Sequence, residues 1–172
     1  NTHTGIVADI NNNLDYTTEI YITEAGARLK GDIALISEFI NPHYAVIGEV
    51  GEQHLEYFKS LENIVETKFE LLQSKRLKKA FVFKDNLKPQ NLDNALAKKI
   101  TYFPENVRNV EANLEGTSFD LFIKNEWHRF DTMVLGQFNV VNLSAAIYMG
   151  VELGLRVEEI QKAVKRIEPI PH

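Results

Sequence analysis

The chain has 172 residues, of which 44% are hydrophobic and 25% charged, so it can bury a core and is neither disordered nor low-complexity. Its net charge of -5 and its scattered basic residues give no electrostatic basis for binding nucleic acid. The lack of cysteine excludes disulfides and thiolate metal sites, which fits a reducing, cytoplasmic compartment. We expect no membrane insertion, because no apolar run approaches the roughly 18 to 20 residues that span a bilayer.

Two short apolar runs in the first third of the chain predict buried strands over residues 19–24 and 44–49. Between them, apolar residues at helical spacing predict a helix over residues 32–40. This helix should end before Pro42, because the residue before a proline disfavours the α region. Two strands joined by a crossover helix should lie parallel, so that the loops after both strands open on the same edge of the sheet.

Each of these two loops carries glycine and one residue that can bind a hard metal ion. Glu24 follows the first predicted strand and His54 lies in the loop after the second. In α/β enzymes the loops at the carboxyl ends of the strands usually hold the chemistry. We therefore predict that Glu24 and His54 come together. The simpler interpretations are that Glu24 caps a helix or pairs with Arg28, and that His54 is an ordinary loop histidine.

The segment after His54 must contain a break. In one unbroken helix, His54 and Lys68 would lie about 21 Å apart along the axis, too far to share a site. Ser60 is a good N-cap, so we predict that a second helix starts there. Lys68 falls in the apolar stripe of that helix, where an unpaired ammonium is costly. Lys68 must snorkel to solvent, pair with a carboxylate such as Glu24 or Glu70, or be chemically modified.

The rest of the chain predicts two further strands, over residues 79–84 and 100–103, with a short helix between them. Three runs of period two then predict an antiparallel meander over residues 107–114, 119–124 and 127–134. Two helices follow, one opening at Asn139 and stopping at Gly154, and one over residues 157–167. The predicted fold is α/β, with a mostly parallel sheet flanked by helices, a small antiparallel β meander, and one domain over residues 1–168.

Five short segments, in order along the chain, carry a resemblance to a known family. They are EAGAR at residues 24–28, VGEQHLE at 50–56, TKFE at 67–70, GQFNVVN at 136–142 and PIPH at 169–172. Together they resemble segments of the central, ATP-binding domain of the Mur ligases, most closely the MurF type. That type joins D-alanyl-D-alanine to the UDP-MurNAc-tripeptide of bacterial cell-wall synthesis. The resemblance also implies a phosphate-loop type of sheet topology.

The resemblance implies an ATP-dependent peptide ligase that forms an acyl phosphate, which an incoming amine then displaces. Magnesium ions would relieve the charge crowding between the phosphates and the substrate carboxylate. The implied cofactors are ATP and Mg²⁺, and the implied substrates are UDP-MurNAc-tripeptide and D-alanyl-D-alanine. The implied site residues are Glu24, His54 and a carbamylated Lys68 as metal ligands, His54 and Lys68 as catalytic groups, Asn139 and Asn142 at the adenine, and Asn1, Thr2 and Arg28 on the substrate side.

One element that the family needs does not occur in these residues. No Gly-x-x-x-x-Gly-Lys-Ser/Thr phosphate loop is present, so we expect the chain to be a piece of a longer enzyme and inactive alone. Residues 1–7 resemble the loop that follows the phosphate-loop helix in the family. Residues 169–172 would then begin the linker to a further domain.

Two positions depart from the family pattern, and other functions stay open. Glu49 stands where asparagine is common, and Phe138 replaces the histidine of the adenine segment. Asn139 and Asn142 are also favoured helix caps. A related ligase of the folylpolyglutamate synthase or cyanophycin synthetase type is one alternative. A non-catalytic α/β binding module is the other.

Overall fold

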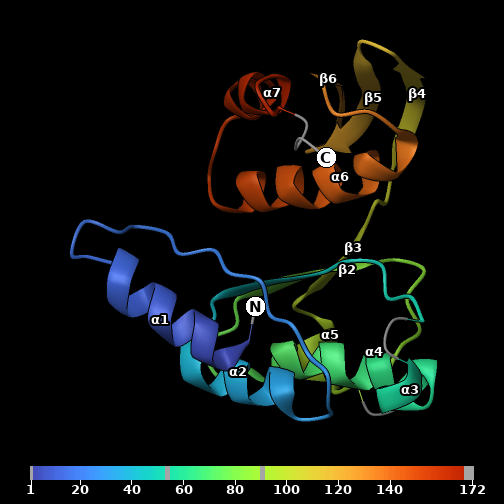
Figure 1. The fold of residues 1–172 in the computed structure, drawn as a ribbon. Helices are drawn as coiled ribbons and strands as arrows, with labels where there is room; N and C mark the ends of the chain where they lie inside the picture. The colour runs from blue at the N-terminus through green and yellow to red at the C-terminus, as the bar shows by residue number, and fades with distance from the viewer. Residues whose placement is uncertain (1, 53–54, 90–91, 169–172) are drawn as a thin grey trace. The chain divides into compact units, whose positions relative to one another are not determined.

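The computed structural model describes residues 2–52, 55–89 and 92–168, and these fold as two compact units (Figure 1). The first unit comprises residues 1–80 and 85–100, and the second comprises residues 81–84 and 101–172. Each unit has its own set of buried apolar side chains.

The first unit is mainly helical. Its elements are α1 (His3–Asn13), α2 (Asp32–Ile40), β1 (Tyr44–Ile47), α3 (Leu55–Phe58), α4 (Leu61–Phe69), the 3₁₀ helix η1 (Glu70–Gln73) and α5 (Asn94–Ala97). The helical pattern that predicted residues 32–40 is confirmed by α2, which buries Ile33 and Ile36. Helix α4 buries Ile64 and Val65 on the stripe predicted for it.

A parallel three-stranded sheet has the order β1-β2-β3, where β2 is Lys79–Phe83 and β3 is Ile100–Phe103. The backbone N–H of Lys78 donates to His43 O at 2.8 Å. These two residues directly precede β2 and β1. Consecutive residues 80–82 of β2 are all buried, which is typical of a parallel strand covered on both faces. The strands predicted over residues 44–49, 79–84 and 100–103 are therefore confirmed.

The strand predicted over residues 19–24 is not formed. This segment has no regular secondary structure, and Ile20 and Ile22, which a strand would bury, are 61% and 87% exposed. The Tyr21 hydroxyl instead donates to the Asp9 carboxylate of α1 at 2.8 Å. Strand propensity reflects packing on a half-buried sheet surface, and no described strand pairs with this segment.

Helix α1 is a second departure from the sequence prediction, which treated residues 1–7 as a loop. Thr2 is its N-cap, and the Thr2 side chain accepts a hydrogen bond from Gly5 N at 3.4 Å. Ile6 is the buried residue of this helix. A threonine followed by a helical run is a capping signal that the sequence contained.

The break predicted before Ser60 is confirmed. Lys59, between α3 and α4, has a positive φ of 66°, which ends the first helix. Ser60 then caps α4, with its Oγ accepting a hydrogen bond from Asn63 N at 3.2 Å. Residues 55–69 therefore form two helices and not one continuous helix.

The second unit packs two helices on one face of an antiparallel sheet (Figure 1). Strands β4 (Val107–Asn113), β5 (Gly116–Ile123) and β6 (Glu126–Thr132) pair in that order and confirm the predicted meander. Their inner face packs on α6 (Gln137–Glu152) and α7 (Val157–Lys165). Its buried core is Phe119, Leu121, Ile123, Phe130, Val140, Leu143, Ile147, Ile160 and Val164.

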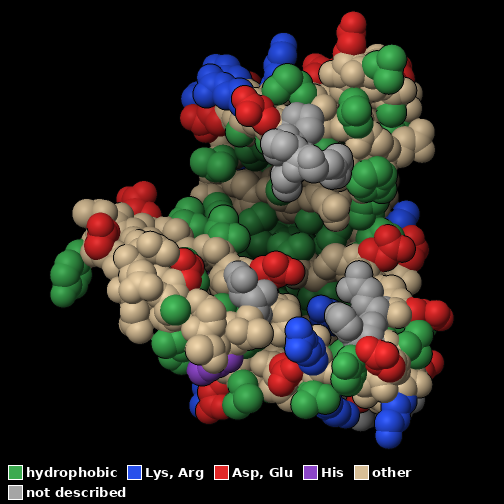
Figure 2. All heavy atoms as spheres, in the orientation of Figure 1, with side chains coloured by type: hydrophobic (Ala, Val, Ile, Leu, Met, Phe, Trp, Pro, Cys, Tyr) green, Lys and Arg blue, Asp and Glu red, His purple; other side chains and the backbone are tan. Residues whose placement is uncertain are grey.

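The surface is mixed in charge. On the face shown in Figure 2, Lys and Arg side chains are interspersed with Asp and Glu. Among the helices of residues 2–52, 55–89 and 92–168, none has the length and apolar composition needed to cross a membrane.

The Ser60 cap gives a test of this local structure. Replacing Ser60 with alanine removes the acceptor for Asn63 N, so we expect the free energy of unfolding to fall by about 1 kcal/mol. Ser60→Asp keeps an acceptor at the N-cap and should stay close to wild type. Urea unfolding followed by circular dichroism measures both, and equal losses in the two variants would contradict the capping role.

Candidate functional site

The predicted site residues fall in both units. Thr2, Glu24, Arg28 and Lys68 belong to the first unit. Asn139 and Asn142 belong to the second unit and share the first turns of α6. Asn1 and His54 lie outside the described residues. The predicted meeting of Glu24 with His54 depended on a strand over residues 19–24, and that strand is not formed.

The EAGAR segment, residues 24–28, lies shortly before the N-terminus of α2. Glu24 and Arg28 are both exposed there, in irregular backbone. The carboxylate of Asp32, the first residue of α2, accepts hydrogen bonds from Arg28 N at 2.8 Å and Leu29 N at 2.9 Å. The backbone that follows the motif is therefore fixed by a carboxylate at the helix start, where a negative charge is favourable.

A second carboxylate, from the TKFE segment, reaches the same helix start. Glu70 is only 7% exposed, and its carboxylate accepts hydrogen bonds from Gly31 N at 3.0 Å and Ala34 N at 3.0 Å. The first N–H groups of a helix have no partner inside the helix, so Glu70 satisfies donors of α2 that would otherwise be orphaned. Nearby, Lys30 Nζ pairs with Glu66 of α4 at 3.0 Å. The TKFE segment is thus joined to the helix start that follows the EAGAR segment.

Lys68 lies in the last turn of α4 and is half-buried. Its chain neighbours Thr67 and Phe69 are both buried, and the Thr67 hydroxyl donates to Asn63 O at 2.8 Å. No hydrogen bond or ion pair of the Lys68 ammonium is found among the described residues. Pairing with Glu70, one of the alternatives that the sequence left open, is not formed, because that carboxylate binds backbone N–H groups of α2.

The donor chemistry for a magnesium ion is only partly present in the described residues. Among residues 2–52, 55–89 and 92–168, no group of three His, Cys, Asp or Glu side chains could hold a metal ion. Magnesium usually keeps several waters and binds one or two carboxylates together with substrate phosphates. Glu24 is one carboxylate of this kind, and its side chain is exposed.

The two candidate adenine residues sit at the start of α6. This helix begins at Gln137, with Gly136 as its N-cap, two residues before the predicted start at Asn139. The Asn139 side-chain amide donates to Leu135 O at 2.7 Å, so it ties the helix to the preceding loop and is not the N-cap. Asn142 and Phe138 are exposed on the same turns.

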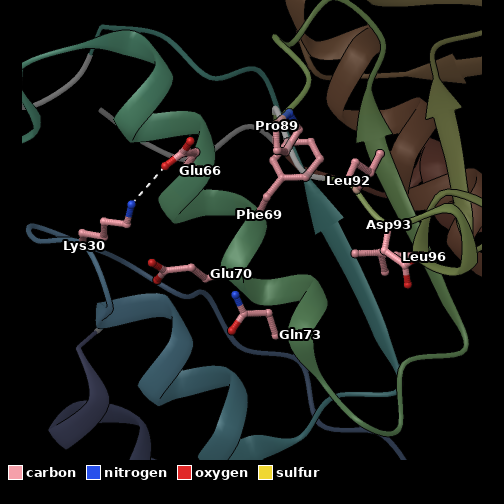
Figure 3. Close-up of a pocket in the computed structure, with 9 residues that line it drawn as sticks. All are labelled: Lys30, Glu66, Phe69, Glu70, Gln73, Pro89, Leu92, Asp93 and Leu96. Atoms are coloured by element: carbon pink, nitrogen blue, oxygen red, sulfur yellow. Dashed lines mark hydrogen bonds and ion pairs between the residues drawn. The ribbon is translucent and has the colours of Figure 1, made fainter.

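A hollow of about 330 Å³ lies in the first unit beside α4 and α5 (Figure 3). Its wall contains Lys30, Glu66, Phe69, Glu70, Gln73, Pro89, Leu92, Asp93 and Leu96. None of the described site residues predicted from the sequence lines it. Glu66 and Glu70 already have hydrogen-bond partners, so these two side chains are not free to bind a ligand in the hollow.

Asp32 and Glu70 were missed as organising residues in the sequence analysis. An aspartate at the first position of a helix is a recognised start signal, so Asp32 could have been found. Glu70 could not, because its partners lie 36 and 39 residues away in the chain.

Glu70 provides a test of this arrangement. In Glu70→Gln, the side-chain NH₂ faces backbone donors, so we expect the free energy of unfolding to fall by about 1 to 3 kcal/mol. Glu38→Gln, at an exposed position of α2, removes the same charge and should change it by less than about 0.5 kcal/mol. Urea unfolding compares the two, and equal values would mean that the contacts of Glu70 with α2 do not stabilise the fold.

The chain is similar to known proteins in both sequence and fold. Residues 1–150 match the Mur ligase middle domain family. The UDP-N-acetylmuramoyl-tripeptide–D-alanyl-D-alanine ligase of Bacillus subtilis (strain 168) is 32% identical over 155 residues, covering 88% of this chain and 34% of the relative. The UDP-N-acetylmuramate–L-alanine ligase of Dictyoglomus turgidum is 28% identical, covering 96% of this chain and 37% of the relative.

Among solved structures, the MurF ligase from Thermotoga maritima in complex with ADP has a TM-score of 0.79 at 22% identity, covering 99% of this chain and 41% of that chain. The chain therefore has the fold of this family and spans about a third of the length of the curated relatives it matches. With a family match over residues 1–150, the chain belongs to the Mur ligase family.

Proposed function

We propose that this chain supplies the ATP-handling part of a MurF-type ligase, which adds D-alanyl-D-alanine to UDP-MurNAc-tripeptide. The observation that supports this type is the 32% identity to the Bacillus subtilis ligase of that name. In the proposal, residues 1–168 are part of the middle domain and residues 169–172 begin a linker. The enzyme would act in the cytoplasm. The Dictyoglomus turgidum relative, named for L-alanine, makes a ligase with another amine substrate the alternative.

The residues with proposed roles toward ATP and magnesium belong to both units. Glu24 and His54 would hold magnesium together with the nucleotide phosphates, and the ion would neutralise charge during phosphoryl transfer. Asn139 and Asn142, on the first turns of α6, would hydrogen-bond the adenine edge. Asn1, Thr2 and Arg28 would face the substrate. The carboxylate of Asp32 holds the backbone of Arg28 by accepting a hydrogen bond from Arg28 N.

A substrate panel tests the proposed specificity. We expect the full-length protein to release phosphate from ATP with UDP-MurNAc-tripeptide and D-alanyl-D-alanine, and to release little with UDP-MurNAc and L-alanine. A coupled phosphate assay measures both reactions. Phosphate release with the second pair alone would assign the protein to the alternative ligase type.

Lys68 has a proposed role as a carbamate. Its half-buried ammonium would repel magnesium, and its neighbour Glu70 forms no ion pair with it, because that carboxylate binds backbone N–H groups of α2. Attack of the neutral Nζ on carbon dioxide forms an N–C bond and releases one proton. The product is an anion whose oxygens suit a hard cation.

Labelled bicarbonate tests this role directly. We expect full-length protein supplied with ¹³C-bicarbonate to show a carbamate carbon signal that is lost in Lys68→Arg, together with most of the turnover. Lys78→Arg, at an exposed lysine, should keep both. Absence of the signal in active wild-type protein, or near-full activity of Lys68→Arg, would make Lys68 a structural lysine.

A further inference from the structure

Asn86 lies in the loop after β2 and binds the backbone just beyond the end of β1. Its Oδ1 accepts a hydrogen bond from Val50 N at 2.8 Å, and its Nδ2 donates to Gly48 O at 2.8 Å. Strand β1 ends at Ile47, so both contacts lie on the loop that leaves its carboxyl end. Asn86 is half-buried and belongs to none of the sequence segments that resemble the family.

The two hydrogen bonds have the pattern of a parallel β ladder. In such a ladder, one residue donates to a carbonyl and accepts from an N–H group on the two sides of a single facing residue. The Asn86 amide does the same on the two sides of Glu49. A side chain therefore continues the pairing of neighbouring strands β1 and β2 beyond the point where both strands have ended.

Only a side chain with a donor and an acceptor at this position can make both contacts. Aspartate of the same size accepts from Val50 N, but when ionised it places a negative oxygen against Gly48 O. Alanine makes neither bond and leaves two half-buried backbone groups without this partner. The loop also contains Gly48 and Gly51, so ordering its backbone costs more conformational entropy.

We propose that Asn86 is a positioning residue, which holds the loop of residues 48–52 in the conformation that the ligase reaction uses. This inference rests on the proposed function, since this loop leads along the chain to the proposed metal ligand His54. Asn86 itself touches neither nucleotide nor metal in this proposal. Its effect passes through the backbone on either side of Glu49.

The test uses Asn86→Ala and Asn86→Asp in the full-length protein. We expect amide hydrogen exchange in a peptide covering residues 48–52 to become about three- to tenfold faster in Asn86→Ala, because two hydrogen bonds are lost. Turnover should fall, and the magnesium concentration that gives half-maximal turnover should rise. Mass spectrometry of exchanged peptides and a magnesium titration provide the two measurements.

Asn86→Asp should show a pH-dependent change in hydrogen exchange that a general loss of stability would not produce. At neutral pH the carboxylate should mimic the alanine variant. Once protonated, the acid can donate to Gly48 O and accept from Val50 N, so protection of residues 48–52, corrected for intrinsic exchange rates, should return toward wild type as the pH falls. If Asn86→Ala does not fold, this pH-dependent recovery alone decides the proposal.

Ser74→Ala is the matched control. The Ser74 hydroxyl donates to Pro42 O at 2.6 Å. Pro42 lies just before the start of β1, at the opposite end of the strand from Gly48. Its loss should lower the melting temperature without changing exchange in residues 48–52 or the magnesium dependence. Wild-type exchange and wild-type magnesium dependence in Asn86→Ala would overturn the proposal.

His54→Ala and His128→Ala separate this inference from the proposed function. His128 lies on β6, in the second unit, whereas the proposed metal ligands belong to the first unit. If both histidine variants keep equal turnover, the proposed metal role of His54 fails, while loop exchange still decides the role of Asn86. If only His54→Ala loses turnover and both Asn86 variants behave as wild type, the Asn86 inference alone fails.

Discussion

The buried carboxylate of Glu70 joins two helices of the first unit. A charge removed from water is costly unless hydrogen bonds replace its hydration, and the N–H groups of Gly31 and Ala34 provide that replacement. The start of α2 and the end of α4 are consequently fixed with respect to each other. Lys68, two residues before Glu70, takes its position from this contact, as does the backbone that follows Arg28.

Local signals predicted local structure well. The Ser60 cap, the αL glycine Gly154 and the period-two meander each depend on residues a few positions apart, and each is present in the structure. The strand expected over residues 19–24 failed because its formation requires a neighbouring strand, which an apolar, β-branched pattern cannot guarantee. The strand that was expected to bring Glu24 to the edge of the sheet is therefore absent.

The candidate site was predictable only where the sequence itself carried a short pattern. Asn139 and Asn142 share a helix face as their spacing of three predicted. The contacts of Glu70 and Asn86 join segments 36 to 39 residues apart, and no local pattern marks such partners. Both residues bind backbone groups, whose identity is the same at every position, so side-chain chemistry alone does not reveal the pairing.

The relatives bear on what this part of the chain contributes to a ligase. Two relatives named for different amine substrates, D-alanyl-D-alanine and L-alanine, match this chain at 32% and 28% identity over most of its length. Likeness over this part of the chain is therefore compatible with either amine substrate. Asp32, Glu70 and Asn86 all lie within residues 1–150, the part of the chain that matches the Mur ligase middle domain. About two thirds of each relative lies outside the part that this chain covers.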